Sequence, residues 1–262
     1  MSIHYIDQGR KDALPVIFLH GFPLNLEMWN EQMKVVSEQY RAIAYDIRGH
    51  GQSDVEDGQY TIESHVDDLI ALLDQLNIKK VVIVGFSMGG YIALRALERN
   101  PERFRGAVLS NTKSEADTDM NKLNRFKAMK SVKENGIEAF ADGFLKMAFA
   151  PETFKTNPEI VENIRKVIKM TPSRSIMGTL LALAARTDTT SVLIKIKVPT
   201  LILVGEKDEI TSPKDAKSMH EKIERSELHI IPNAAHMSNL ENPFVYNEKL
   251  LNFLRRLLEI QQ

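Results

Sequence analysis

Short apolar runs rich in β-branched residues alternate with amphipathic stretches in two separated parts of this sequence. Parallel strands are joined by crossover helices, so the alternation predicts an α/β fold with helices on both faces of a mostly parallel sheet. In the first part, residues 27–39 and 63–77 are the amphipathic stretches, and a third helix is expected from Ser87 to about Asn100, before Pro101. The predicted strands are residues 16–19, 42–45, 81–84, 107–109, 201–204 and 229–231.

Residues 113–190 separate the two parts and contain helical stretches but no convincing strand. We therefore expect residues 1–112 and 191–262 to form one α/β core, with residues 113–190 as a helical cap inserted within that single domain. A last helix should begin with Asn242 as its cap and Pro243 in its first turn.

Charge and cysteine content exclude several classes of protein. The 34 Lys and Arg residues nearly balance the 35 Asp and Glu residues, which argues against nucleic acid or a membrane surface as the partner. The absence of cysteine excludes disulfides, thiolate metal sites and a cysteine nucleophile. No apolar run approaches the roughly 18 residues that span a bilayer, and no signal-peptide pattern is visible, so a cytoplasmic protein is expected.

A Gly-x-Ser-x-Gly motif with Ser87 at its centre directly follows one predicted strand and directly precedes a helix. This context is typical of a nucleophilic serine on a tight turn, where small residues such as Gly85 and Gly89 prevent a collision. The alternative is a serine in an accidental glycine-rich turn.

The expected partners of such a serine follow it in the chain. Asp208 lies just after the strand 201–204, and His236 lies in the loop after the strand 229–231. Both loops leave the carboxyl ends of their strands, so both side chains can meet Ser87 at one edge of the sheet. His236 would be the general base, and Asp208 would orient its imidazole.

Other residues could replace these partners. Glu206 and Asp215 are the rival acids, and His229 is the rival histidine, although its place within a strand favours a packed position. His20 follows an early strand and is interpreted as a brace of the turn after it. That turn would aim the backbone N–H of Phe22 at the same point as the N–H of Met88, forming an oxyanion hole.

Taken together, these motifs resemble those of the α/β-hydrolase family over nearly the whole chain. The resemblance implies an eight-stranded, mostly parallel sheet with a helical cap, the triad Ser87, Asp208 and His236, and no metal or organic cofactor. It also implies a structural role for Asp46, Arg48 and His50. The matching segments are residues 20–23, 46–53, 85–90, 205–208 and 233–237.

The expected function is hydrolysis of small-molecule carboxylic esters with short to medium acyl chains, by a monomer or homodimer. Residues 111–112, 116–118 and 237–243 are similar to the branch that contains 3-oxoadipate enol-lactonases, so a lactonase is the alternative. Cofactor-free perhydrolases share the motif around Ser87, which leaves that side activity open. A ligand receptor on a hydrolase scaffold is the third interpretation.

Substrate choice is expected to depend on the cap and the pocket rim. Methionine suits an adaptable apolar pocket, although each candidate methionine also falls at helical core spacing. The basic residues between Met120 and Lys133 could guide an anionic substrate, but a solvated face is the preferred interpretation. The candidate pocket residues are Trp29, Met120, Met129, Met147 and Met177.

Overall fold

The protein is described by a computed structural model, in which residues 1–259 are placed. Its strands are β1 (Tyr5–Gln8), β2 (Pro15–Leu19), β3 (Arg41–Tyr45), β4 (Val81–Phe86), β5 (Phe104–Ser110), β6 (Thr200–Gly205) and β7 (Ser226–Ile231). They form one sheet in the order β1-β3-β2-β4-β5-β6-β7. β1 is antiparallel to β3 and all other neighbours are parallel, which confirms the predicted α/β fold.

The expectation of eight strands is wrong, because residues 1–259 form seven. Ahead of β1, residues 1–4 form no strand, because the N–H of Ser2 donates to the Asp54 side chain and that of His4 to the Ser53 hydroxyl. Gly9, with φ +80°, ends β1, and a Cβ there would lie 2.1 Å from the carbonyl oxygen of Tyr40. The backbone therefore turns sharply at Gly9 toward β2, where a larger residue would not fit.

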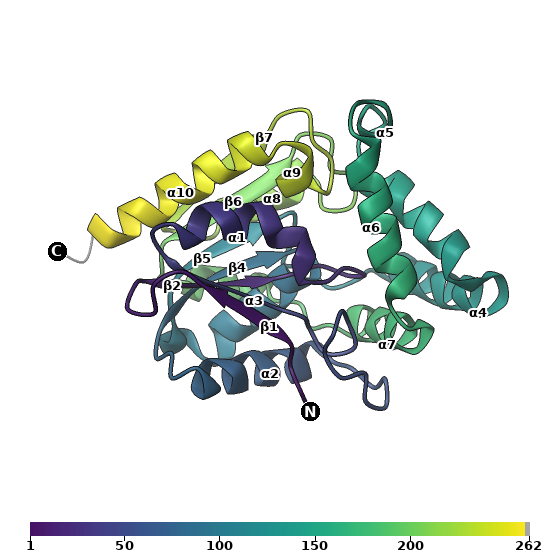
Figure 1. The fold of residues 1–262 in the computed structure, drawn as a ribbon, viewed down its shortest axis with the longest axis horizontal. Coiled ribbons are helices and arrows are strands. Elements are labelled where there is room, and N and C mark those ends of the chain that lie inside the picture. The colour runs from purple at the N-terminus through teal and green to yellow at the C-terminus, as the bar shows by residue number, and fades with distance from the viewer. Residues whose placement is uncertain (260–262) are drawn as a thin grey trace.

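Helices cover both faces of the sheet (Figure 1). Side chains from α2, α3 and α8 form a cluster on one face, and those from α1 and α10 form a second cluster on the other. Along β2, Ile17 and Leu19 join the first cluster while Val16 and Phe18 join the second, as the alternation of a strand requires. The helices are α1 (Asn30–Ser37), α2 (Ile62–Gln75), α3 (Met88–Arg99), α4 (Asp119–Ala148), α5 (Thr153–Thr156), α6 (Pro158–Met170), α7 (Ser173–Ala184), α8 (Pro213–His220), α9 (Ser238–Glu241) and α10 (Pro243–Glu259).

Three short 3₁₀ helices complete the list of elements: Leu26–Trp29, Pro101–Arg103 and Thr190–Lys195. The first leads directly into α1, so the predicted helix 27–39 is two shorter elements. Asn242 caps α10 as expected, because its side-chain oxygen accepts a hydrogen bond from the backbone N–H of Val245 at 3.3 Å.

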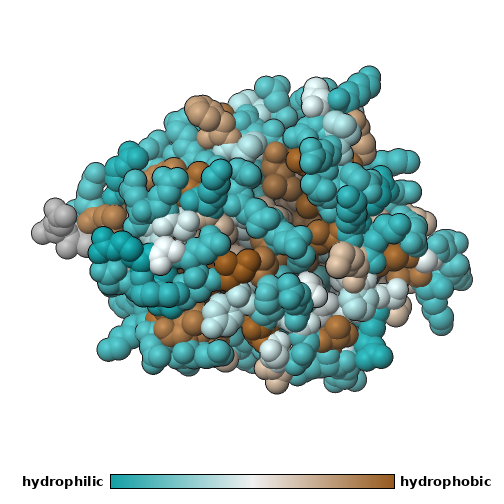
Figure 2. Space-filling view, in the orientation of Figure 1, coloured by the Kyte–Doolittle hydropathy of each residue, from teal (hydrophilic) through white to brown (hydrophobic). Residues whose placement is uncertain are grey.

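The helical insertion lies between β5 and β6 and consists of α4 through α7, which stand together at one end of the molecule (Figure 1). Its longest helix, α4, is kinked at Gly136, which has φ +80° and ψ +177°. On the face shown in Figure 2, a recessed group of apolar residues, surrounded by polar ones, lies between α6 and the α/β core. Among residues 1–259, no helix is both long and apolar enough to cross a membrane.

Candidate active site

Ser87 occupies a strained turn between β4 and α3, with φ +51° and ψ −111°. Two glycines make the turn possible. A Cβ at Gly85 would lie 2.3 Å from the carbonyl oxygen of Gly89, and a Cβ at Gly89 would lie 2.3 Å from that of Leu19. The backbone therefore tolerates no larger residue on either side, and the positive φ of Ser87 is held by close packing.

Ser87, His236 and Asp208 form one continuous chain of hydrogen bonds. The Oγ of Ser87 lies 2.9 Å from Nε2 of His236, and Nδ1 of the same imidazole lies 2.8 Å from Oδ2 of Asp208. Ser87 is 9% exposed, His236 1% and Asp208 3%. The structure thus brings together the three residues that the sequence places 121 and 28 positions apart, with the nucleophile at the most accessible end.

The Asp208 carboxylate is held ionised by its surroundings. Its Oδ1 accepts hydrogen bonds from the backbone N–H groups of Ile210 at 2.8 Å and Thr211 at 3.0 Å. Its Oδ2 accepts from the Thr211 hydroxyl at 2.8 Å and from Nδ2 of Asn111 at 2.9 Å. Burial alone would raise the pKa of this carboxyl, but the His236 charge and these hydrogen bonds outweigh burial and lower the pKa to about 2.

The rival residues have other roles. Glu206 accepts a hydrogen bond from the backbone N–H of Asn233 at 3.0 Å, and Asp215 caps α8 through Ser212. His229 lies on β7 with a 35% exposed side chain, 3.4 Å from Glu227. None of these contacts involves Ser87.

Phe22 and Met88 were the predicted oxyanion-hole donors. A Cβ at Gly21 would lie 3.1 Å from the Cβ of Ser87, so the turn after β2 passes directly beside the serine. Neither the Phe22 nor the Met88 backbone N–H has a hydrogen-bond acceptor within residues 1–259. Two backbone donors without an acceptor, one next to Ser87 in the chain and one in the turn beside it, suit the predicted role in an oxyanion hole, and this role stays a prediction.

His20 braces this turn, as its position in the sequence suggested. Its Nδ1 donates to the carbonyl oxygen of Gly21 at 2.9 Å, and its Nε2 accepts from the N–H of Ile47 at 2.9 Å. Burial is the main cause that lowers the pKa of His20. Asp46 has a comparable structural place, because it accepts from the N–H groups of Leu26 at 2.8 Å and Gln52 at 2.9 Å.

The five candidate pocket residues lie in different surroundings in the structure. Trp29 is fully buried in the core and packs against Phe18 with ring centroids 5.2 Å apart, which corrects its predicted place at the pocket rim. Met120 and Met147 face solvent, with 62% and 61% of their surface exposed. The buried residues of α4 are instead Val132, Ala141, Phe144, Leu145 and Ala148.

Two methionines stay candidates for the substrate pocket. Met129 is partly buried against the cluster that contains Phe22 and Met88. Met177 is half-buried on α7. Both remain predictions.

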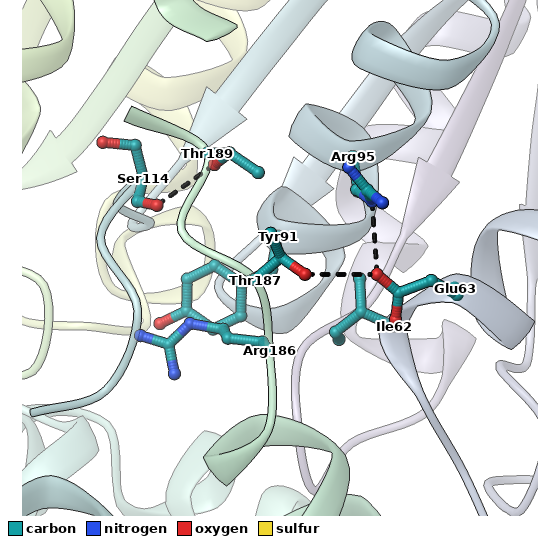
Figure 3. Close-up of a pocket in the computed structure, with 8 residues that line it drawn as sticks. All are labelled: Ile62, Glu63, Tyr91, Arg95, Ser114, Arg186, Thr187 and Thr189. Carbon is teal, nitrogen blue, oxygen red and sulfur yellow. Dashed lines mark hydrogen bonds and ion pairs between the residues drawn. The ribbon is translucent and has the colours of Figure 1, made fainter. Parts of the chain in front are cut away.

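A small pocket lies where the chain leaving the cap passes α2 and α3 (Figure 3). Its volume of about 10 Å³ is room for about one water molecule, so it is too small for an ester substrate. The guanidinium of Arg186 lies there, 4.3 Å from the centre of the Tyr91 ring. Arg186 also pairs with Asp117 at 2.5 Å, and both side chains are at most 2% exposed. The pair joins the two ends of the insertion, and the contact of Arg186 with Tyr91 links it to α3.

Residues 15–243 match the family model of the alpha/beta hydrolase fold. The chain belongs to the α/β-hydrolase family. The seven-stranded sheet, the helical insertion and the Ser87 turn described above are the features that this membership accounts for.

Similar proteins from this family carry several activities. The chain is 30% identical to 3-oxoadipate enol-lactonase 2 of Acinetobacter baylyi over 98% of this chain and 94% of that one. It is 35% identical to a non-heme chloroperoxidase of Kitasatospora aureofaciens over 89% of this chain and 85% of that one. A thermophilic esterase from Thermogutta terrifontis superposes with a TM-score of 0.93 at 33% identity, covering 97% of this chain and 93% of the other.

The sequence reasoning missed Thr211 and gave Asn111 no role beside the triad, although residues 111–112 were part of the resemblance to enol-lactonases. Asn111 directly follows β5 at the same sheet edge as Asp208 and His236, and that position was a usable signal. Thr211 is three residues after Asp208 and carried no motif of its own.

Proposed function

We propose that the protein is a carboxylic ester hydrolase that acts on short to medium acyl chains through an acyl-serine intermediate. The observation that carries this proposal is the pair of hydrogen bonds, 2.9 and 2.8 Å long, that joins Ser87 to His236 and His236 to Asp208. Such a chain makes a serine hydroxyl nucleophilic at neutral pH, because the imidazole accepts its proton as the hydroxyl attacks.

In the first half of the reaction, Oγ of Ser87 attacks the ester carbonyl carbon while Nε2 of His236 takes the hydroxyl proton. Asp208 stabilises the imidazolium through Nδ1. The negative charge on the former carbonyl oxygen is stabilised by the N–H groups of Phe22 and Met88. When the tetrahedral intermediate collapses, the alcohol leaves with the proton from His236, and the acyl group stays on Ser87.

In the second half, His236 takes a proton from a water molecule that attacks the acyl-serine. The second tetrahedral intermediate forms in the same oxyanion site. Its collapse returns the proton from His236 to Oγ of Ser87 and releases the carboxylic acid.

The aromatic contacts around the oxyanion turn support a small acyl site. The ring of Phe22 lies 5.9 Å from that of Phe140 in the cap, and Phe140 stacks on Phe144 at 6.5 Å. These rings bring the cap close above the turn beside Ser87, which favours short acyl chains over long ones.

The experiment that tests this proposal is steady-state hydrolysis of p-nitrophenyl esters from acetate to palmitate. We expect kcat/KM to be highest for short chains and to disappear in Ser87→Ala. Ester turnover in Ser87→Ala within tenfold of wild type contradicts the proposal. Turnover below about 0.01 s⁻¹ on every ester, against roughly 1–1,000 s⁻¹ for typical enzymes, would favour a ligand receptor instead.

A lactonase is the second candidate, and the similarity to the Acinetobacter enol-lactonase favours it. The triad would open a cyclic ester by the same steps, with the leaving alcohol kept in the product. The segment around Asp117 lends less support than the sequence suggested, because Asp117 is occupied by Arg186 and Arg125. An enol-lactone turned over at least a hundredfold faster than every ester, about 2.7 kcal/mol in the barrier, would assign the protein to this branch.

Perhydrolysis is a proposed side activity, and the similarity to the Kitasatospora chloroperoxidase supports it. Hydrogen peroxide would replace water in the attack on the acyl-serine, and the product would be a peracid. Peracid formation that depends on acetate, peroxide and Ser87 would demonstrate it.

A further inference from the structure

Asn111 stands at the carboxyl end of β5, immediately after Ser110, and is completely buried. Its backbone is left-handed, with φ +46°, and its N–H donates to the carbonyl oxygen of Leu203 in β6 at 2.8 Å. Asparagine tolerates this conformation better than most residues do. The left-handed backbone accounts for an asparagine at this position, but it does not account for the contacts that the buried side chain makes.

The Asn111 amide uses all of its hydrogen-bonding capacity inside the site. Nδ2 donates to Oδ2 of Asp208 at 2.9 Å and to the carbonyl oxygen of Ala235 at 3.3 Å. Oδ1 accepts from the hydroxyls of Ser238 at 2.6 Å and Ser110 at 3.2 Å. Two donated and two accepted hydrogen bonds satisfy a side-chain amide completely.

These partners determine which way the amide points. The Asp208 carboxylate and the Ala235 carbonyl can only accept, so the nitrogen must face them, while the two serine hydroxyls can donate to the oxygen. Ala235 and Ser238 flank His236 in the chain. One rigid group on β5 thus contacts the acid loop and both sides of the histidine.

We propose that Asn111 is the positioning residue that clamps the Asp208 loop to the His236 loop, and so keeps the carboxylate and the imidazole in register. This inference rests on the proposed function, because the clamp serves the triad. The other hydrogen bonds to the Asp208 side chain, apart from that of His236, come from Ile210 and Thr211 in its own loop. Within residues 1–259, Asn111 and His236 are therefore the two side chains outside the Asp208 loop that hydrogen-bond to this carboxylate.

Asn111→Gly tests the clamp, because glycine accepts the left-handed backbone but has no amide. The matched control is Asn233→Gly, which removes an exposed asparagine with φ +57° from the histidine loop. Loss of a hydrogen bond to a charged group predicts a fall in kcat of about 10- to 100-fold in Asn111→Gly, with KM changed less than threefold. Thermal unfolding confirms that both variants are folded.

The variant Asn111→Asp should give a pH-dependent activity that would not be expected if Asn111 only supported the fold. The new carboxyl has the shape of the amide but, when ionised, opposes Asp208 at a contact of 2.9 Å in the native protein. When protonated, it can donate to Asp208 and restore the contact. The ratio of its kcat/KM to that of wild type should therefore rise severalfold from pH 9 to pH 6, whereas the ratio for Asn111→Gly should stay flat.

The contact between His236 and Asp208 can also be tested without any substrate. In wild type, the His236 Nδ1 proton should give a protected low-field NMR resonance, because it is held against Asp208. We expect rapid exchange to remove this resonance in Asn111→Gly but not in Asn233→Gly. This arm separates the two proposals: if no ester or lactone is turned over, the proposed function fails, and the resonance alone decides for or against the clamp.

Two results overturn the clamp. One is a kcat for Asn111→Gly within threefold of that for Asn233→Gly together with a flat pH ratio for Asn111→Asp. The other is a protected Nδ1 resonance that survives in Asn111→Gly.

Discussion

The ring of Phe22, which follows Gly21 in the turn beside Ser87, packs against the ring of Phe140 from the cap at a centroid distance of 5.9 Å. On its other side Phe22 meets the buried ring of His50 at 6.2 Å, edge to face. The oxyanion turn is therefore held between the core and the cap. A change in the cap can reach the reacting atoms through this pair.

Phe140→Ala should widen the acyl site and loosen the turn. An aromatic pair contributes about 0.5–1.5 kcal/mol, so we expect kcat/KM for the acetate ester to fall up to about tenfold, with a smaller loss for the octanoate ester. Steady-state kinetics on the ester series measures both. Phe244→Ala is the control, because Phe244 on α10 is 79% exposed, and an equal loss there would contradict the prediction.

Ser87→Ala should lower ester turnover by at least about a thousandfold, because what remains without the nucleophile comes from binding and the oxyanion donors. Progress curves at high enzyme concentration measure the residual rate. Ser173→Ala, an exposed serine at the start of α7, should leave kcat unchanged.

Three buried histidines should make the free energy of unfolding depend on pH. Burial, the largest cause in each case, lowers the pKa of His20, lowers that of His50 to about 3, and lowers that of His65 well below its usual value. These groups are neutral when folded but gain protons on unfolding below about pH 6.5, so stability is lost as the pH falls from there.

His65 is the sharpest test of this dependence, because neither of its ring nitrogens has a hydrogen-bond partner within residues 1–259. The free energy of unfolding falls for both proteins when the pH is lowered from 7.5 to 5, but the fall should be about 2 kcal/mol smaller in His65→Leu than in wild type. Urea titration at both pH values measures it. His229→Gln, which changes a half-exposed histidine, should keep the wild-type slope. Equal slopes for all three proteins would contradict the prediction.

Arg186→Met should lower the free energy of unfolding by about 3–5 kcal/mol, because it leaves Asp117 charged and buried with only Arg125 beside it. The double variant Arg186→Met, Asp117→Leu should recover most of this loss, since it removes the orphaned charge. Denaturant titration measures both. Arg10→Met breaks a pair whose side chains are 77% and 71% exposed, and it should leave the denaturation midpoint unchanged.

The sequence predicted the parts of the structure that depend on local pattern. All six strands inferred from apolar runs are present, and the helix after Ser87 ends at Arg99, just before Pro101. β1 was missed because four half-exposed or exposed residues at a sheet edge carry no buried run. Trp29 was misplaced because sequence alone does not tell which face of the sheet a bulky residue will fill.

Asn111 shows how far the same reasoning could have gone. The argument that placed Asp208 and His236 at one sheet edge applies equally to a polar residue directly after β5. What the sequence could not supply is the contact itself, which joins residues 97 positions apart and depends on how β6 docks beside β5.

The order of the site along the chain has a consequence for folding. Ser87 precedes the whole cap, whereas its histidine comes 149 residues later, beyond β7. Pairing of Ala107 with Thr200 must close a loop that contains the entire insertion before that histidine can arrive. During synthesis Ser87 therefore emerges long before its base, and the appearance of Ser87-dependent turnover would time the last long-range step of folding.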